Sequence, residues 1–390
     1  MNQGRTPEQG DLAGPVQTVP ARAPAGVLPG IQYLRGLCAV LVVVSHANGF
    51  LAFPQYFGRS VVASLHEAAV FSVAAFFAIS GFIIVVTSFD DRGAQRVDLA
   101  RFARRRLARI VPFLWVCTAG YAALRFAGTG DVDPGSLLRT LVLWPTGELR
   151  PNVAWSLRHE AAFYAIFALT MLGKRKWPAV MLAWLLAPLP YAWWVEVAGP
   201  MPSDLDPWSA GAAFANVAGG GENGANLQFL VGMAIGYLHL RGHLRGNWPA
   251  WIMLAAFAGS CAVILAAPIE AGIARRVLWT ALAGIVVYAA GRTRAAADLA
   301  DRAGRVLGDA SFSIYLVHNM VMLVILELTM RTGLAALVPG QLAAYLCFCV
   351  VVSVAACCAV HHSIERPLIA AANRLGQIWP ARVRKETGCR

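Results

Sequence analysis

Long runs of apolar residues recur along the chain, separated by short polar or basic stretches. The runs are continuous and do not alternate, which is typical of membrane-spanning α-helices and unlike the strands of a transmembrane β-barrel. Ten runs have the length of a span, and they cover residues 31–53, 66–87, 107–127, 152–172, 178–198, 224–241, 248–267, 273–291, 309–331 and 337–361. The run at 136–146 is shorter and contains Arg139, so we expect it to be interfacial or re-entrant.

The composition agrees with this pattern. Of 390 residues, 58% are hydrophobic and 14% are charged, whereas a soluble domain has about 25% charged residues. We predict an all-α, polytopic integral membrane protein in a lipid bilayer, with about ten transmembrane helices and no soluble domain. Residues 1–29 are rich in Pro, Gly and Ala and lack an apolar run. They are expected to form a disordered cytoplasmic tail, followed by a membrane domain at 30–370 and a basic cytoplasmic tail at 371–390.

Basic residues gather in alternate connections between the predicted spans. They are concentrated at 92–106, 174–176, 241–245, 292–305 and in the C-terminal tail. The positive-inside rule therefore predicts that both termini are cytoplasmic. These anchors account for the net charge of +12, so we do not expect nucleic-acid binding. The eight cysteines form no CxxC pair, and the chain has no HExxH, GxSxG or P-loop sequence, so we expect neither a metal site nor a permanently bound cofactor.

Two ionisable residues lie within the first predicted span. Arg35 opens an apolar run and His46 closes it eleven positions later. On an α-helix this spacing is three turns plus about 20°, so both side chains share a face and lie roughly 16 Å apart along the axis. The predicted topology then places Arg35 at the cytoplasmic interface and His46 near the bilayer midplane. An ionisable side chain at that depth indicates a functional site.

Two more ionisable side chains approach the middle of the bilayer. Glu160 lies roughly 12 Å below the outer surface, and His318 lies about 13 Å in from the cytoplasm, by the helical rise. Three such groups on three spans predict a polar cavity, in which a histidine can act as general base with a carboxylate to orient it. The alternative is that His46 and His318 are buried polar residues that only bridge helices.

Further candidates lie in the spans nearby. Arg106 and Arg109 are three positions apart on one helical face, an arrangement that suits phosphate groups, although both could simply anchor the cytoplasmic interface. Ser80 stands in the sequence FFAISGFII, where small residues permit close helix packing or contact with substrate. His318 and Trp155 are the other two residues that we consider for contact with substrate.

Several motifs together resemble the acyltransferase-3 family of bacterial integral-membrane O-acyltransferases. They occur in the family's order and cover about residues 31–370: I-x-YLRGL-x-A-x-LVV-x-SH (31–46), FFAISGFII (76–84), RR-x-x-RI-x-P (105–112), AWSLRHEAAFY (154–164), FLVGMAIGY (229–237), LGDASFSIYLVH (307–318) and IERPL (364–368). The resemblance implies ten helices in the inner membrane. It also implies transfer of an acyl group, usually acetyl from acetyl-CoA, to hydroxyls of exopolysaccharide, lipopolysaccharide O-antigen, nodulation factors or macrolides. Many members carry an extra periplasmic esterase-like domain, which we do not expect here.

The family pattern implies roles for particular residues. Its paired Arg and His correspond to Arg35 and His46, its Arg-x-x-Arg pair to Arg106 and Arg109, and its WSL-x-x-E glutamate to Glu160. The resulting hypothesis is an acyltransferase of class EC 2.3.1 with acyl-CoA as donor. His46 is the general base, Glu160 orients His46 or the acceptor, and the arginines bind the donor.

Some alternatives stay open at this point. Direct transfer and a covalent acyl-His46 intermediate need the same residues. A proton-coupled secondary transporter could use the same intramembrane His and Glu groups as a relay. A flippase-like partner in a polysaccharide assembly complex would need no chemistry of its own. The residues indicate neither the acceptor's identity nor the oligomeric state.

Overall fold

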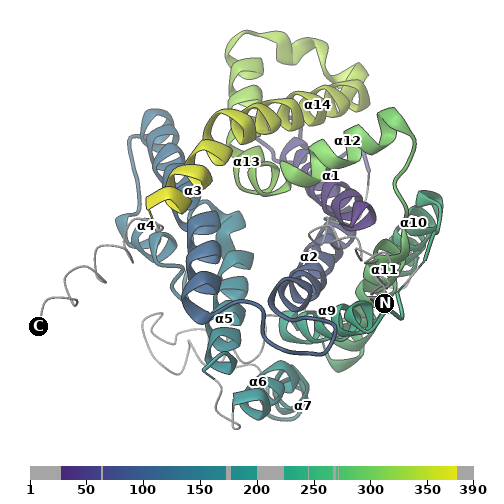
Figure 1. Ribbon diagram of the computed structural model, residues 1–390. Helices are drawn as coiled ribbons and strands as arrows, with labels where there is room; N and C mark the ends of the chain where they lie inside the picture. Colours follow the sequence, from purple (N-terminus) through teal and green to yellow (C-terminus); the bar gives the residue numbers. More distant parts are fainter. Residues whose placement is uncertain are drawn as a thin grey trace, which may run out of the picture.

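The computed structural model describes residues 28–62, 65–172, 177–199, 224–244, 246–266, 269–270 and 272–375. Within these residues the regular structure is helical, with two isolated β-bridges and no strand. The helices (Figure 1) are α1 (Pro29–Leu51), α2 (Leu65–Ser88), α3 (Leu99–Thr129), α4 (Pro134–Leu141), α5 (Trp155–Thr170), α6 (Trp177–Leu186), α7 (Pro188–Ala198), α9 (Ala225–Leu240), α10 (Ala250–Ala266), α11 (Ile273–Arg292), α12 (Asp298–Asp309), α13 (Ser311–Arg331) and α14 (Leu342–Val360). A π-helical turn at His361–Glu365 follows α14.

Each predicted apolar run overlaps a helix. Among the described residues, six helices are long and apolar enough to cross a membrane: α1, α2, α3, α11, α13 and the continuous helix from Leu342 to Leu375. The apolar helices α9 and α10 are shorter. The chain is therefore helical with several potential membrane spans, and the count of about ten stays a prediction. The tails were expected at 1–29 and 371–390. Residues 1–27 and 376–390 of these tails, and most of the connection 199–223, lie outside the described residues.

Two predicted segments differ in detail from the helices observed. The run at 178–198 is divided into α6 and α7, and Pro188 is the first residue of α7, where its missing N–H costs no helical hydrogen bond. Helix α3 begins at Leu99, eight residues before the predicted start at 107, because Asp98 caps it by accepting a hydrogen bond from the Arg101 N–H at 2.7 Å. The first turns of α3 therefore carry much of the basic stretch.

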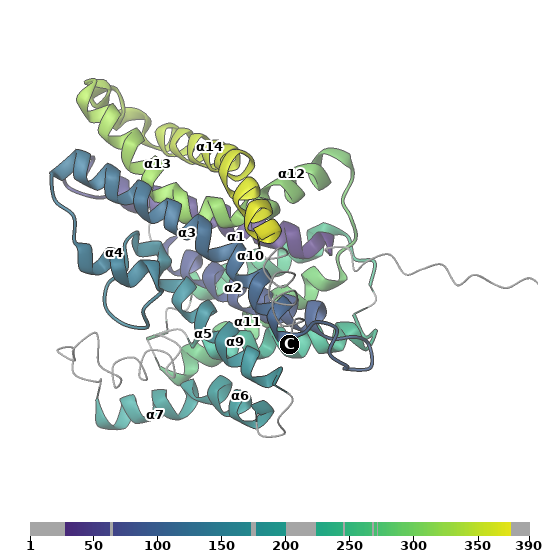
Figure 2. The same cartoon turned by 60° about the vertical axis from the view of Figure 1, so that its left-hand side comes forward.

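The helices form a bundle around α1 and α2. In Figure 1 these two helices lie near the middle, with α3 and α5 on one side and α10 and α11 on the other. Turned by 60°, α13 and α14 lie together at one edge, and α6 and α7 lie at the opposite edge (Figure 2). Helix α12 packs along α1, where Gly308 lies against the backbone of Gln32. This helix was not predicted from the sequence.

Helices α2 and α9 are packed backbone to backbone. A Cβ added at Gly81 would clash with the Phe229 carbonyl, and one added at Gly232 would clash with the Ala78 carbonyl. Close approach through small residues is typical of helix pairs in membranes. The packing fixes α2, whose other faces carry Phe76 and Ser80 toward the site described below.

We expect Gly232→Ala to destabilise the protein, because the new methyl group has no space beside the Ala78 carbonyl. Overpacking of this kind costs about 1–3 kcal/mol. Thermal unfolding in detergent should show a lower Tm. The matched control is Gly259→Ala on α10, where no atom lies within 4 Å of the added Cβ. Equal unfolding temperatures for the two variants would contradict the close packing of α2 on α9.

Candidate active site

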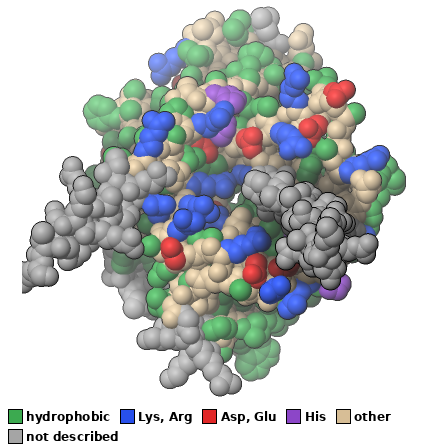
Figure 3. Space-filling view, viewed as in Figure 1, with side chains coloured by type: hydrophobic (Ala, Val, Ile, Leu, Met, Phe, Trp, Pro, Cys, Tyr) green, Lys and Arg blue, Asp and Glu red, His purple; other side chains and the backbone are tan. Residues whose placement is uncertain are grey.

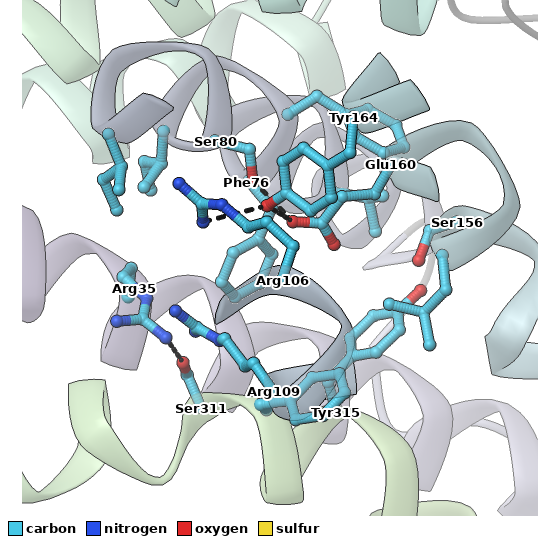
Figure 4. Close-up of a pocket in the computed structure, with 16 residues that line it drawn as sticks. Arg35, Phe76, Ser80, Arg106, Arg109, Ser156, Glu160, Tyr164, Ser311 and Tyr315 are labelled. Carbon is cyan, nitrogen blue, oxygen red and sulfur yellow. Dashed lines mark hydrogen bonds between the residues drawn. The ribbon is translucent and has the colours of Figure 1, made fainter. Parts of the chain in front are cut away.

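A cavity lies between α1, α2, α3, α5 and α13 and holds about 660 Å³ of empty space, which includes its opening to solvent (Figure 4). It combines an apolar wall with several charged and hydroxyl groups. The lining side chains are Arg35, Val73, Phe76, Phe77, Ile79, Ser80, Ile83, Arg106, Arg109, Ser156, Leu157, Glu160, Tyr164, Ser311, Phe312 and Tyr315. On the face seen in Figure 3, Lys and Arg side chains gather around a central hollow.

Arg35 is held at one side of the cavity by two hydrogen bonds. One guanidinium nitrogen donates to the Gln32 side-chain oxygen at 2.9 Å, and another donates to the Ser311 hydroxyl at 2.8 Å. Gln32 itself donates to an Asp309 carboxylate oxygen at 2.5 Å. Arg35 is thus fixed both from its own helix and from α13, with its guanidinium in the cavity wall (Figure 4).

Arg106 and Arg109 reach the same cavity from α3, as their helical spacing predicts (Figure 4). The guanidinium carbon of Arg106 lies 4.8 Å from the Tyr164 ring centre, a cation–π distance. A second hollow of about 590 Å³ adjoins the cavity and shares Ile83, Arg106 and Arg109 with it. Arg105 also lines this second hollow. The two hollows therefore share part of their lining, and guanidinium groups from α1 and α3 are among the residues that line them.

Glu160 contributes a carboxylate to the cavity. Its Oε1 atom accepts a hydrogen bond from the Ser80 hydroxyl at 3.1 Å and another from the Tyr164 hydroxyl. The Tyr164 oxygen also lies 3.4 Å from an Arg106 guanidinium nitrogen, which links the carboxylate to α3 (Figure 4). We expected Glu160 to orient either His46 or the acceptor, and in the structure its carboxylate is hydrogen-bonded to Ser80 and Tyr164.

His46 pairs instead with His318. His46 Nδ1 and His318 Nε2 are 2.7 Å apart, and the two rings are nearly parallel at an interplanar angle of 14°. His318 is fully buried, and its Nδ1 atom lies 2.7 Å from the Ile314 carbonyl oxygen. Neither histidine is among the residues that line the cavity. Tyr315 lies next to both the cavity and the histidine pair: it lines the cavity, and its ring centre is 6.5 Å from that of His318.

The structure thus divides the predicted residues into two groups. Arg35, Ser80, Arg106, Arg109 and Glu160 share one cavity, and His46 and His318 form a separate pair beside it. Trp155 lies outside the lining, where its ring packs edge-on against Phe77 and His159.

Sequence reasoning missed four polar lining residues. They are Ser156, Tyr164, Ser311 and Tyr315. A helical-face test would have found them, because Ser156 and Tyr164 stand four positions on either side of Glu160, and Ser311 and Tyr315 are four apart on α13. Among the described residues, no group of three or more His, Cys, Asp or Glu side chains is arranged to hold a metal ion. The chemistry that the side chains offer is therefore acid–base catalysis and the binding of anions.

Comparison with known proteins identifies the family. The family model described as an acyltransferase domain matches residues 28–361, which is most of the chain. The chain belongs to the acyltransferase-3 family. It is 28% identical over 306 residues to the exopolysaccharide production protein ExoZ of Rhizobium meliloti (strain 1021), covering 75% of this chain and 87% of that protein. No solved structure matches the chain. With its apolar helices, the family membership makes this a multi-pass membrane acyltransferase.

Proposed function

We propose that the protein is an O-acyltransferase of class EC 2.3.1 that moves an acyl group, most simply acetyl, from acyl-CoA to a hydroxyl of a carbohydrate or glycolipid. The observation that carries the proposal is the convergence of Arg35, Arg106 and Arg109 from two helices on one cavity. Guanidinium groups bind phosphates in a bidentate manner, and CoA carries several phosphates. Arg105 extends this cationic surface into the adjoining hollow, which has room for more of the nucleotide part of the donor.

The same arginines suggest how the protein is oriented. We propose that it lies in the bacterial inner membrane with both termini and the arginine-lined entrance in the cytoplasm. The positive-inside rule supports this orientation, since the basic stretch at 92–106 leads into the cavity through α3. CoA thioesters are cytoplasmic, so the donor would reach its phosphate-binding groups directly.

In the proposed reaction, the phosphates of the donor lie among the arginines and the thioester reaches inward to the turn that carries Tyr315. The acceptor hydroxyl attacks the thioester carbonyl carbon while its proton moves to the unprotonated ring nitrogen of His46. The bond between carbonyl carbon and sulfur then breaks, and the CoA thiolate takes the proton from His46. Glu160 holds Ser80 and Tyr164 in place and balances part of the cationic charge.

A carbohydrate acceptor is supported by the similarity to ExoZ, which is described as an exopolysaccharide production protein. We propose that this chain likewise modifies a hydroxyl of an exopolysaccharide or its lipid-linked precursor. Mass spectrometry of the cell's polysaccharides, with and without the gene for this chain, should show an ester that is lost with the protein.

The direct test uses the full chain in lipid nanodiscs with acetyl-CoA and an oligosaccharide taken from that polysaccharide. We expect free CoA to be released only when the oligosaccharide is present, together with an acetylated product. Release of many equivalents of CoA per protein without any hydroxyl acceptor would contradict the proposal. Proton uptake by proteoliposomes without CoA release would indicate the proton-coupled transporter instead.

Removing the Tyr164 hydroxyl should weaken catalysis while the fold persists. Tyr164→Phe keeps the ring beneath Arg106 but leaves Glu160 with one hydrogen bond fewer. A hydrogen bond to a charged group is worth about 1.5–3 kcal/mol, so we expect kcat/KM to fall about tenfold or more. The matched control is Tyr121→Phe on α3, outside the cavity lining, and equal activity of the two variants would argue against the network.

A further inference from the structure

The pairing of His46 with His318 determines where the hydrogens of both rings lie. A backbone carbonyl oxygen can only accept a hydrogen bond, so the 2.7 Å contact with Ile314 requires the hydrogen to be on Nδ1 of His318. In a neutral imidazole the other nitrogen is then a pure acceptor. His318 is fully buried, and no described carboxylate forms an ion pair with either ring, so the neutral form is the one that burial favours.

The tautomer of His46 follows from that of His318. Because His318 Nε2 is an acceptor, the hydrogen shared across the 2.7 Å contact belongs to Nδ1 of His46. Neutral His46 then carries its lone pair on Nε2. His318 is fully buried, whereas His46 is only partly buried. Of the two rings, His46 is therefore the one that a reactant could reach.

We propose that His318 is a positioning residue, which holds His46 in the tautomer whose lone pair is on Nε2, the nitrogen that acts as the base. This inference rests on the proposed acyltransferase reaction. His318 occupies the place that a carboxylate has in a Ser-His-Asp triad, next to the nitrogen that does not react. The neutral partner avoids burying a charge beside the base in the resting protein, and it still accepts a hydrogen bond from His46 after His46 takes the acceptor proton. The chain Ile314 carbonyl–His318–His46 fixes the orientation of both rings.

This role differs from contact with substrate, for which His318 was first considered. Both ring nitrogens of His318 are engaged within the protein, and the side chain has no exposed surface. Substituting it should therefore act through His46. We expect His318→Leu to lower kcat by about 100-fold, within the range for general base catalysis, with little change in the KM for acyl-CoA. His318→Gln, whose amide oxygen can accept from His46, should recover part of the loss.

The decisive measurement does not depend on activity. We propose solid-state ¹⁵N NMR of the full chain, labelled at histidine and reconstituted in lipid, because protonated and unprotonated ring nitrogens have distinct shifts. The His46 signals are assigned as those missing from His46→Gln. We expect Nδ1 of His46 to be protonated in the wild-type protein, and part of the population to move to the Nε2-protonated tautomer in His318→Leu. His243→Leu, in the exposed turn after α9, is the control.

Two outcomes would overturn the inference. The first is a wild-type spectrum in which His46 carries its hydrogen on Nε2. The second is a folded His318→Leu variant with unchanged His46 tautomer and unchanged kcat. If His318→Leu does not fold, the wild-type spectrum alone decides. A protein that shows the expected tautomer but transfers no acyl group would contradict the proposed function and leave the hydrogen-bond assignment intact.

Discussion

Replacing His46 by alanine should nearly abolish acyl transfer. A general base contributes typically about 10²- to 10⁴-fold to a rate, and the His46–His318 pair lies beside the cavity, next to the lining residue Tyr315. Binding of the donor should persist, because Arg35, Arg106 and Arg109 line the cavity and His46 does not. We therefore expect kcat to fall by about 10²- to 10⁴-fold, while the affinity for CoA stays near that of the wild-type protein.

The measurement is acceptor-dependent CoA release in nanodiscs, with CoA affinity determined separately by calorimetry. His243→Ala is a matched histidine substitution away from the site and should remain active. Full transfer by His46→Ala would remove His46 from the mechanism. Labelled acetyl-CoA added without acceptor distinguishes the two chemical routes, since a covalent intermediate leaves label on wild-type His46 and direct transfer leaves none.

Charge reversal at Arg106 and Arg109 should raise the KM for acyl-CoA strongly and affect kcat much less. Both side chains line the cavity and the adjoining hollow, and a bidentate contact between a guanidinium and a phosphate is a charge-assisted hydrogen bond. Losing two such contacts at about 1.5–3 kcal/mol each corresponds to an increase of about 100-fold or more in KM.

The control for this variant is Arg96→Glu with Arg101→Glu. These two arginines belong to the same basic stretch, are exposed and lie outside both hollows. The control therefore changes the net charge of the protein, and the basic charge that sets its orientation under the positive-inside rule, by the same amount as the double variant at Arg106 and Arg109. Initial rates over a range of donor and acceptor concentrations separate the two KM values. An increase confined to the KM of the acceptor would count against a role in binding the donor.

The grouping of Arg35, Arg106 and Arg109 could be predicted from the sequence, because helical spacing and the positive-inside rule place all three near the cytoplasmic interface. Helical rise gives the height of a side chain in the membrane, and the periodicity of 3.6 residues gives its face. These rules are local to one helix. They led us to expect a polar cavity formed by His46, Glu160 and His318, whereas the cavity in the structure is lined by Glu160 together with the three arginines and by neither histidine.

The partner of His46 could not be predicted in this way. His46, Glu160 and His318 were expected at similar depths, and depth does not reveal which helices are neighbours. Packing decides that question: α13 lies beside α1 and brings His318 to His46, while Glu160 faces Ser80 on α2. Helix α12 was missed for another reason. Its charged residues, such as Asp298 and Arg302, hid an amphipathic helix from a search for continuous apolar runs.

Of the described residues that line the cavity, three carry a guanidinium group and one, Glu160, carries a carboxylate. Phosphates take no part in acyl transfer, so the attraction that brings the donor in is equally strong once the acyl group has left. Such uniform binding captures substrate and retains product alike. Free CoA should therefore inhibit the enzyme by competing with the donor, and CoA departure should limit turnover at low ionic strength. Added salt screens these charges, so it should weaken binding of acyl-CoA and speed the dissociation of free CoA.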